Sequence, residues 1–263
     1  MNAYQTIEFE KKDNIAILWL NRPEIHNAFN EVMISEIIDC VEHVNTMNDV
    51  RVLILRGRGK SFCAGADLKW MSGVAGYTFE RNYKESYQLS KCFYGLYTCN
   101  KPTIAMVHGA AMGGANGLLA ACDFAFCEDD TTFSLSEVKI GIVPACISPY
   151  VIKRVGEYGA REIMLTGRRI KGKEAESCKL VNQSFTMEAL EEHVRSVIGH
   201  LITSGPRAMD HCKKLIYNVT NQLELEEALD YTATVIAEIR ASEEGQEGMA
   251  AFLEKRKPNW VKQ

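Results

Sequence analysis

The stretch Gly109-Ala-Ala-Met-Gly-Gly-Ala-Asn-Gly117 follows an apolar run at residues 103–107 and opens a segment of helical character. The first N–H groups of a helix lack partners within the helix, and the helix dipole favours negative charge beside them. Its glycines are not spaced as in a dinucleotide-binding fingerprint, and no acidic residue follows at the required distance. The stretch therefore predicts a strand-to-helix turn that either binds an anion or needs glycine only for close packing.

A second glycine-containing turn, Ser61-Phe-Cys-Ala-Gly-Ala-Asp-Leu68, precedes it along the chain. It comes shortly after the apolar run 52–55, which predicts a buried strand. Small residues in both turns would let a ligand approach the main chain closely. The two turns together are the candidate binding site.

Short apolar runs predict the strands, which lie at residues 15–20, 52–55, 103–107, 124–126 and 131–133. Between the first two strands, apolar residues recur at helical spacing from Met33 to Val44, and Asn30 is the predicted N-cap of this helix. A strand, a helix and a strand in succession favour right-handed crossover units. The sequence therefore predicts an α/β fold.

Helical periodicity dominates the chain from about Ala160 onward. One apolar face runs from Leu190 to Leu201, and another runs from Leu225 to Ile239. We therefore divide the chain into an α/β core, residues 1–200, and a C-terminal helical region, residues 201–263. The helical region is expected to pack on its own core or on a partner subunit.

The composition excludes several classes of protein. The chain has 263 residues, 46% of them hydrophobic, and a net charge of −4, so no positive field favours nucleic acid or an anionic membrane. The sequence predicts neither a secretory signal nor a membrane span, and its residues suggest no metal site. The nine cysteines form no CxxC pair and mostly lie among apolar residues, as in a reducing compartment. A cytoplasmic protein without a metal is expected.

Five segments carry a resemblance to a known family, and they are FCAGADL (62–68), KPTIAMVHGAAMGG (101–114), AACDFAF (120–126), FSLSEVKIGIVP (133–144) and FLEKRKPNW (252–260). In this order and spacing the chain resembles the crotonase superfamily, also called the enoyl-coenzyme A hydratase/isomerase family, over essentially its full length. The resemblance implies a ClpP-like spiral of ββα units as the core and a C-terminal helical region that forms trimers. It also implies an acyl-coenzyme A partner, no further cofactor, and a homotrimer or homohexamer.

The same resemblance implies how the site works. The backbone N–H groups of Ala66 and Gly114 would hold the thioester oxygen, and Glu137 would handle the proton on the neighbouring carbon. Proton transfer beside a thioester carbonyl passes through an enolate, and fixed N–H donors stabilise the charge that gathers on its oxygen. The substrate and its coenzyme A part would contact His26, Asn27, Ala28, Ala64, Gly65, Asp67, Leu68, Gly113, Gly117 and Lys255.

Gly117 departs from the pattern of the family's typical hydratases. Those enzymes carry a first glutamate three residues beyond the second glycine of the turn, and here that position holds Gly117. Asn116 is a poor replacement, because neighbouring helix positions point in different directions. The missing side chain is expected to leave a pocket that a substrate with a bulky or polar far end could fill.

The segment from Glu137 to Val151 looks like a subgroup of the family, the bacterial methylglutaconyl- and isohexenylglutaconyl-coenzyme A hydratases. Such a substrate carries a distal carboxylate, which Lys139, Lys153 or Arg154 could meet, although ordinary solvated charges are the alternative reading. Two other functions stay open. The single glutamate suffices for an isomerase that moves a double bond from position 3 to position 2. A non-catalytic role in binding coenzyme A or RNA is the third.

Overall fold

The computed structural model of the protein describes residues 4–74 and 76–261. Its centre is a six-stranded sheet in the order β1-β2-β3-β4-β6-β9, in which only β1 and β2 pair antiparallel. The strands are β1 (Ile7–Lys12), β2 (Ile15–Leu20), β3 (Val52–Gly57), β4 (Thr103–Val107), β6 (Phe124–Glu128) and β9 (Gln183–Phe185). Parallel neighbours need crossover connections, which helices supply, so the predicted α/β class is confirmed.

A second, three-stranded sheet includes part of the glycine-containing turn 109–117. It consists of β5 (Ala110–Met112), β7 (Thr132–Ser134) and β8 (Ile170–Lys171), with β7 in the middle. β5 lies within the glycine-containing stretch 109–117, and β7 leads toward Glu137. This small sheet therefore joins the segment of Gly114 to the segment that leads to Glu137.

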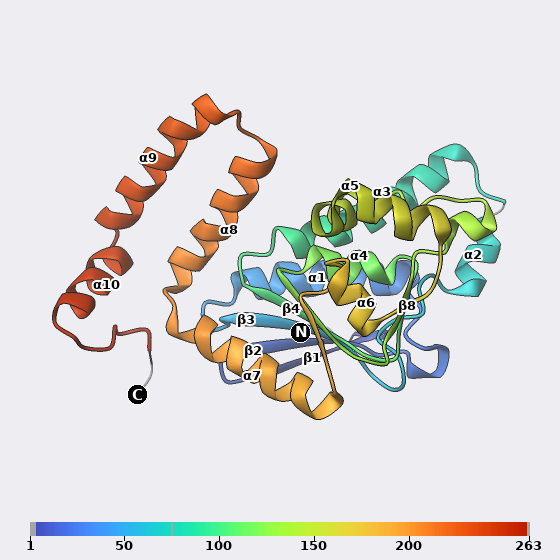
Figure 1. Ribbon diagram of the computed structural model, residues 1–263, viewed down its shortest axis with the longest axis horizontal. Coiled ribbons are helices and arrows are strands. Elements are labelled where there is room, and N and C mark those ends of the chain that lie inside the picture. The colour runs from blue at the N-terminus through green and yellow to red at the C-terminus, as the bar shows by residue number, and fades with distance from the viewer. Residues whose placement is uncertain (1–3, 75, 262–263) are drawn as a thin grey trace.

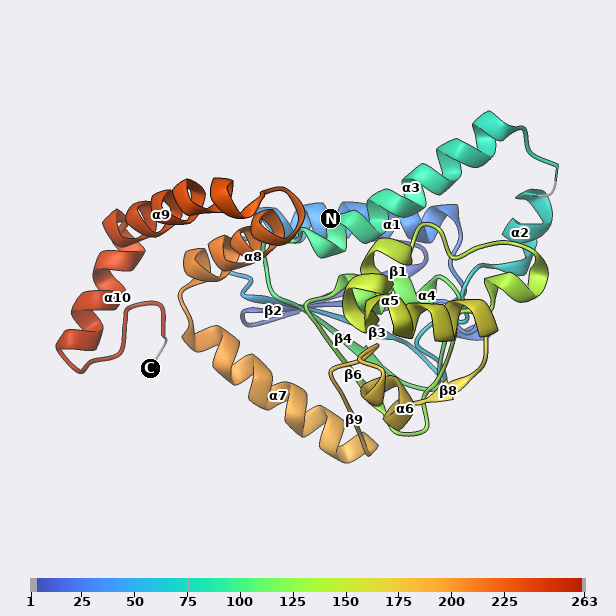
Figure 2. The ribbon, with the colours of Figure 1, turned by 45° about the horizontal axis from the view of Figure 1, so that its top comes forward.

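Alternate residues of the large sheet face two separate apolar layers. Leu53 and Leu55 belong to the core that includes α1 (Glu31–Thr46), α3 (Phe79–Tyr97), α4 (Ala115–Ala121) and α5 (Ser148–Thr166). Val52 and Ile54 pack instead with α7 (Met187–Thr203). The division follows from the two-residue period of a strand. Figure 2 shows α7 on one side of the sheet and α1 and α3 on the other.

The helix predicted after the first strand begins where expected. The side chain of Asn30 accepts a hydrogen bond from the N–H of Met33 at 3.1 Å, which makes it the N-cap of α1. Three further short helices are α2 (Leu68–Val74), α6 (Gly172–Ser177) and the 3-10 helix η1 (Pro23–Ile25). The predicted N-cap is therefore confirmed.

Three helices form an arm that projects from the core (Figures 1 and 2). They are α8 (Pro206–Asn221), α9 (Leu225–Ala241) and α10 (Glu243–Leu253). The predicted boundary between residues 200 and 201 lies within α7. On α9, the side chains of Leu225 and Leu229 are 83% and 70% exposed. No helix in the described part of the chain has the length and apolar character needed to span a membrane.

Candidate active site

The two glycine-containing turns lie side by side. The N–H of Cys63 donates to the carbonyl of Ala110 at 3.0 Å, and the N–H of Met112 donates to the carbonyl of Cys63 at 3.1 Å. Gly65 has a φ of 92°, and a Cβ there would lie 2.7 Å from the carbonyl oxygen of Met112. Only glycine accepts both this backbone conformation and this approach. The pairing places the segment 64–66 alongside the segment 112–114.

Two main-chain N–H groups on these segments have no hydrogen-bond acceptor within residues 4–74 and 76–261, those of Ala66 and Gly114. The groups around Ala66 are engaged, because the N–H of Phe29 donates to Gly65 and the N–H of Asp67 donates to Phe29, both at 2.9 Å. Most main-chain N–H groups in a packed region have partners. Two free N–H groups on neighbouring segments can together donate hydrogen bonds to an oxyanion.

Gly114 is the N-cap of α4, so its N–H lies at the positive end of that helix. The aromatic ring of Phe29 covers the residue closely, because a Cβ on Gly114 would lie 2.5 Å from Cζ of Phe29. The main chain of Phe29 also forms a bridge with Ala66. Phe29 therefore contacts both predicted donors and fixes them relative to each other.

Glu137 begins η2 (Glu137–Ile140), and its carboxylate lies against the glycine turn. A Cβ on Gly113 would lie 3.3 Å from Oε1 of Glu137. Oε2 is buried without a hydrogen-bond partner in the described part of the chain. Burial raises the pKa of the Glu137 carboxyl above its ordinary value, and a hydrogen bond to its own main chain offsets part of that rise. A carboxyl group of this kind suits proton exchange with a bound molecule.

Asn27 and His26 attach the loop before α1 to the second turn. Asn27 is fully buried at a φ of 57°, and its Nδ2 donates to the carbonyls of Arg58 and Ser61 at 2.7 and 2.8 Å. The carbonyl of His26 accepts from the N–H of Ala64 at 2.9 Å, and its Nδ1 lies 3.2 Å from Oγ of Ser61. The side chain of Asn27 therefore makes its hydrogen bonds with the main chain of the protein.

Asp67 and Arg22 form a second link between the same two segments. Their side chains pair at 2.8 Å, and Arg22 also donates to the carbonyl of Ala28 at 2.7 Å. Burial by itself would raise the pKa of Asp67, but hydrogen bonds from the Lys69 N–H and from Arg22 hold it below its ordinary value. Asp67 thus links the turn 61–68 to the loop before α1, and its carboxylate is paired with Arg22 and the Lys69 N–H.

The remaining predicted contact residues divide by exposure. His26, Ala64 and Leu68 face solvent, and Leu68 is 81% exposed. Ala28 and Gly65 are buried. The exposed three come from two segments that hydrogen bonds join.

The space beside Gly117 is filled, so the expected pocket is absent and that prediction was wrong. A Cβ on Gly117 would lie 2.9 Å from Cβ of Ile147 and from Cε1 of Phe93, and closer still to Cγ2 of Ile147. Both side chains are buried, with exposures of 2% and 0%. Ile147 and Phe93 could not be predicted as neighbours of Gly117, because their approach to Gly117 depends on how α3 and the start of α5 pack on α4.

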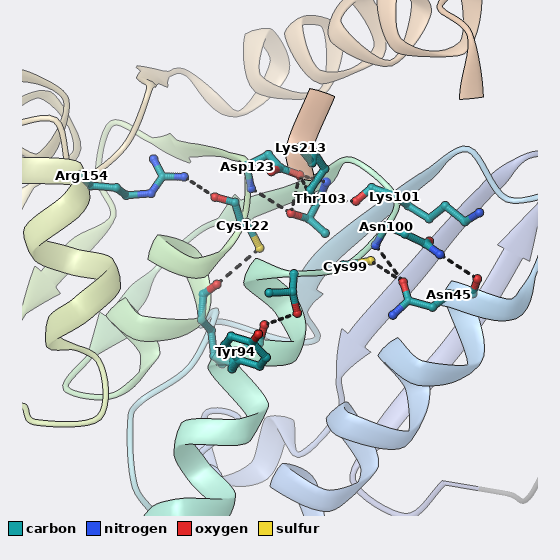
Figure 3. Close-up of polar contacts among 12 residues, drawn as sticks. Asn45, Tyr94, Cys99, Asn100, Lys101, Thr103, Cys122, Asp123, Arg154 and Lys213 are labelled. Atoms are coloured by element: carbon teal, nitrogen blue, oxygen red, sulfur yellow. Dashed lines mark hydrogen bonds and ion pairs between the residues drawn. The ribbon is translucent and has the colours of Figure 1, made fainter. Parts of the chain in front are cut away.

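The three cations considered for a distal carboxylate lie in different surroundings. Arg154 donates to the carbonyls of Ala120 and Cys122 at 3.1 and 2.7 Å, as Figure 3 shows for Cys122. Lys153 donates to Asn221 of α8. Both line a cavity of about 770 Å³ between α8 and the core, which none of the predicted site residues lines. Lys139 belongs to η2, as Glu137 does.

Within one chain, Lys255 lies away from the other predicted site residues. It follows α10 at the end of the arm, on the opposite side of the molecule from α2 (Figure 1). Its neighbour Arg256 is held by Glu247 at 2.7 and 2.8 Å. Contact between Lys255 and a substrate would require the site of another subunit.

The sequence matches known proteins along nearly its whole length. Residues 10–263 match the family described as enoyl-CoA hydratase/isomerase. A crotonyl-CoA hydratase from Syntrophomonas wolfei is 34% identical over 261 residues, which cover 98% of this chain and 99% of the relative. A peroxisomal Delta(3,5)-Delta(2,4)-dienoyl-CoA isomerase from Arabidopsis thaliana is 30% identical over 276 residues, covering 100% and 99%.

The fold matches as well. The crystal structure of an enoyl-CoA hydratase from Shewanella pealeana superposes with a TM-score of 0.94 at 38% identity, over 98% of this chain and 96% of that one. The chain therefore belongs to the enoyl-CoA hydratase/isomerase family, a family of enzymes, and its α/β fold is that of the crotonase superfamily.

Proposed function

We propose that the protein is an enoyl-coenzyme A hydratase, a carbon–oxygen lyase. The observation that supports this most is the position of Glu137 against Gly113. Within residues 4–74 and 76–261, its Oε2 and the N–H groups of Ala66 and Gly114 on the two neighbouring segments have no hydrogen-bond partner. In this proposal the thioester oxygen accepts from both N–H groups. The oxygen of water bonds to the β-carbon, and the double-bond electrons move onto the thioester as an enolate.

Glu137 completes the addition by protonating the α-carbon. The proton that water loses passes to the Glu137 carboxylate, so the residue returns to its starting state. Donors fixed in advance stabilise the enolate without reorganisation during the reaction. The acyl thioester is the substrate, and the proposal requires no further cofactor.

The proposed substrate is 3-methylglutaconyl-coenzyme A, which would give 3-hydroxy-3-methylglutaryl-coenzyme A in leucine degradation. Its support is the resemblance of the segment 137–151 to hydratases of that class. Lys139 lies on the same short helix as Glu137, so it is the candidate for the distal carboxylate. We also propose a cytoplasmic location, from the spacing of the cysteines.

A second candidate, an isomerase of 3-enoyl-coenzyme A, has one specific observation in its favour. Ile147 and Phe93 fill the space where a glutamate at position 117 would stand, so α4 supplies no second carboxylate to hold water. Glu137 alone would take a proton from C2 of the substrate and return it to C4. The enolate and both N–H donors are common to the two reactions.

One experiment separates the two reactions. The purified protein is incubated with 3-methylglutaconyl-, crotonyl- and 3-hexenoyl-coenzyme A, and the enoyl absorbance and product mass are followed. Hydration raises the product mass by one water, whereas isomerisation leaves the mass unchanged. Conversion of the 3-enoyl substrate without water addition to any of the three would reject the hydratase. Addition to crotonyl- but not 3-methylglutaconyl-coenzyme A would reject only the proposed substrate.

A further inference from the structure

Asn116 lies in the first turn of α4, two residues after Gly114. Its side chain is completely buried. Its Nδ2 donates to three main-chain carbonyls, those of Gly113 at 2.9 Å, Ser134 at 3.0 Å and Ala111 at 3.3 Å. A reversed amide would place Oδ1 against three carbonyl oxygens, so the orientation is determined.

The other end of this amide is left without a partner. Oδ1 of Asn116 is buried and accepts no hydrogen bond within the part of the chain that the structure describes. Buried polar atoms without partners destabilise a protein, and native structures contain few of them. An apolar residue would avoid this cost, so the amide is expected to serve a purpose through its donors.

The bond to Gly113 sets the direction of the predicted oxyanion donor. The peptide group is planar and trans, so the carbonyl of Gly113 and the N–H of Gly114 point in opposite directions. Asn116 holds that carbonyl twice, through its main-chain N–H at 3.0 Å and through Nδ2. The N–H of Gly114 is therefore turned away from Asn116, to the side where none of the described residues supplies an acceptor.

The bond to Ser134 connects the same turn to the strand that leads to Glu137. The carbonyl of Ser134 accepts from Asn116 and also from the N–H of Gly113 at 2.8 Å. Glu137 follows Ser134 by three residues, and its carboxylate lies against Gly113. The buried amide of Asn116 thus connects the turn that holds the Gly114 N–H to the strand β7, which precedes Glu137.

We propose that Asn116 is a positioning residue for the enolate site. It orients the Gly113–Gly114 peptide toward the thioester oxygen and holds β7 so that Glu137 reaches the α-carbon. The inference rests on the proposed enolate chemistry, but it holds equally for water addition and for isomerisation. Because the side chain of Asn116 is completely buried, it is not expected to contact the substrate, and its loss is expected to lower kcat while KM changes little.

The test uses Asn116→Leu, which keeps the approximate size, and Asn116→Ala as a second variant. The readout is exchange of the α-protons of butyryl-coenzyme A in D₂O, which reports enolate formation without water addition or a double-bond shift. Removing an oxyanion donor outright costs about 10²–10³ in kcat, and we expect the misdirected donor to cost about 10- to 100-fold. Melting curves establish that each variant is folded.

Asn45→Leu is the matched control. Oδ1 of Asn45 accepts from the N–H of Asn100 at 2.9 Å, and its carbonyl accepts from the side chain of Asn100 at 3.0 Å. This network joins the end of α1 to the turn after α3 (Figure 3), and none of its residues contacts the predicted donors. The control is expected to keep the exchange rate of the wild type.

The outcomes separate this inference from the proposed function. A folded Asn116→Leu or Asn116→Ala variant with wild-type kcat would overturn the role of Asn116, and so would a change confined to KM. Absence of exchange, hydration and isomerisation in the wild-type protein would instead overturn the proposed function itself. Lost exchange in both variants, with the control unaffected, would support the positioning role.

Discussion

Glu137 holds its proton more tightly than an ordinary glutamate, because burial disfavours its charged form and Oε2 has no partner in the described part of the chain to stabilise the charge. Such a carboxyl group can give a proton to carbon and take it back at a pH closer to neutral. Its neighbours Gly113 and Gly114 have no side chain that could share the task. At the residue scale, the proposed proton chemistry therefore depends on one group.

Replacing this carboxyl tests that dependence. We expect Glu137→Gln to lower turnover of crotonyl-coenzyme A by about 10²-fold or more, the usual contribution of a positioned acid or base. Loss of enoyl absorbance measures the rate. Glu128→Gln is the matched control, because burial also raises the pKa of Glu128, which lies at the end of β6 outside the site. Full turnover by Glu137→Gln would remove the residue from the mechanism.

The pH dependence follows from the direction of the pKa shift. Exchange of an α-proton needs Glu137 in its ionised form, so the exchange rate rises with pH and levels off above the pKa of the folded state. Because burial raises that pKa, the midpoint is expected above the ordinary value of 4.5. Exchange rates of butyryl-coenzyme A across a pH series measure the midpoint. A midpoint at or below 4.5 would contradict the buried environment.

At the scale of elements, the sequence predicted the strands that are continuous apolar runs. β2 and β4 have the expected bounds, because Asn21 and Pro102 limit them. β1 was not predicted, because it is an edge strand in which charged residues interrupt the apolar ones. α2 was not predicted, because it buries no residue and so has no periodic apolar face.

The candidate site was predictable to a smaller extent. The pairing of the turns around Ala66 and Gly114 came from family resemblance, because hydrogen bonds between Cys63 and Ala110 leave no periodic trace in a sequence. The filled space beside Gly117 depends on side chains from two other helices. Long-range packing of this kind is settled only by the folded structure.

The packing around Gly117 gives a prediction about α4. Gly117→Glu is expected to destabilise the protein by about 1–3 kcal/mol or more, because the new side chain would overlap Ile147 and Phe93. Adding Ile147→Gly relieves part of the overlap, so the double variant is expected to melt at a higher temperature than the single one. It is also expected to hydrate crotonyl-coenzyme A faster than Ile147→Gly alone. A wild-type melting temperature for Gly117→Glu would contradict the packing.

At the scale of the whole molecule, the arm leaves apolar surface uncovered. Leu229 and Ile236 of α9 are 70% and 47% exposed, and a groove of about 530 Å³ runs between α8 and α9. Large exposed apolar surfaces commonly mark interfaces. The homotrimer or homohexamer implied by the family resemblance stays a prediction, and the arm is where its contacts are expected.

Sedimentation velocity tests this assembly. We expect the wild-type protein to sediment as a trimer or hexamer, and Leu229→Glu/Ile236→Glu to sediment as a smaller species, because charges on an apolar interface oppose association. Glu238→Gln, on the same helix, is the control and is expected to assemble normally. A monomeric wild-type protein would disprove the assembly.

The two proposed oxyanion donors are peptide groups, and this has an evolutionary consequence. A point mutation can replace the side chain at Ala66, but it leaves the N–H in place unless the new residue is proline. The two proposed donors can therefore persist while side chains around them change. A lineage with this scaffold can exchange one reaction for another by small side-chain steps. Relatives named as a hydratase and as an isomerase, both at least 30% identical to this chain, fit such a history.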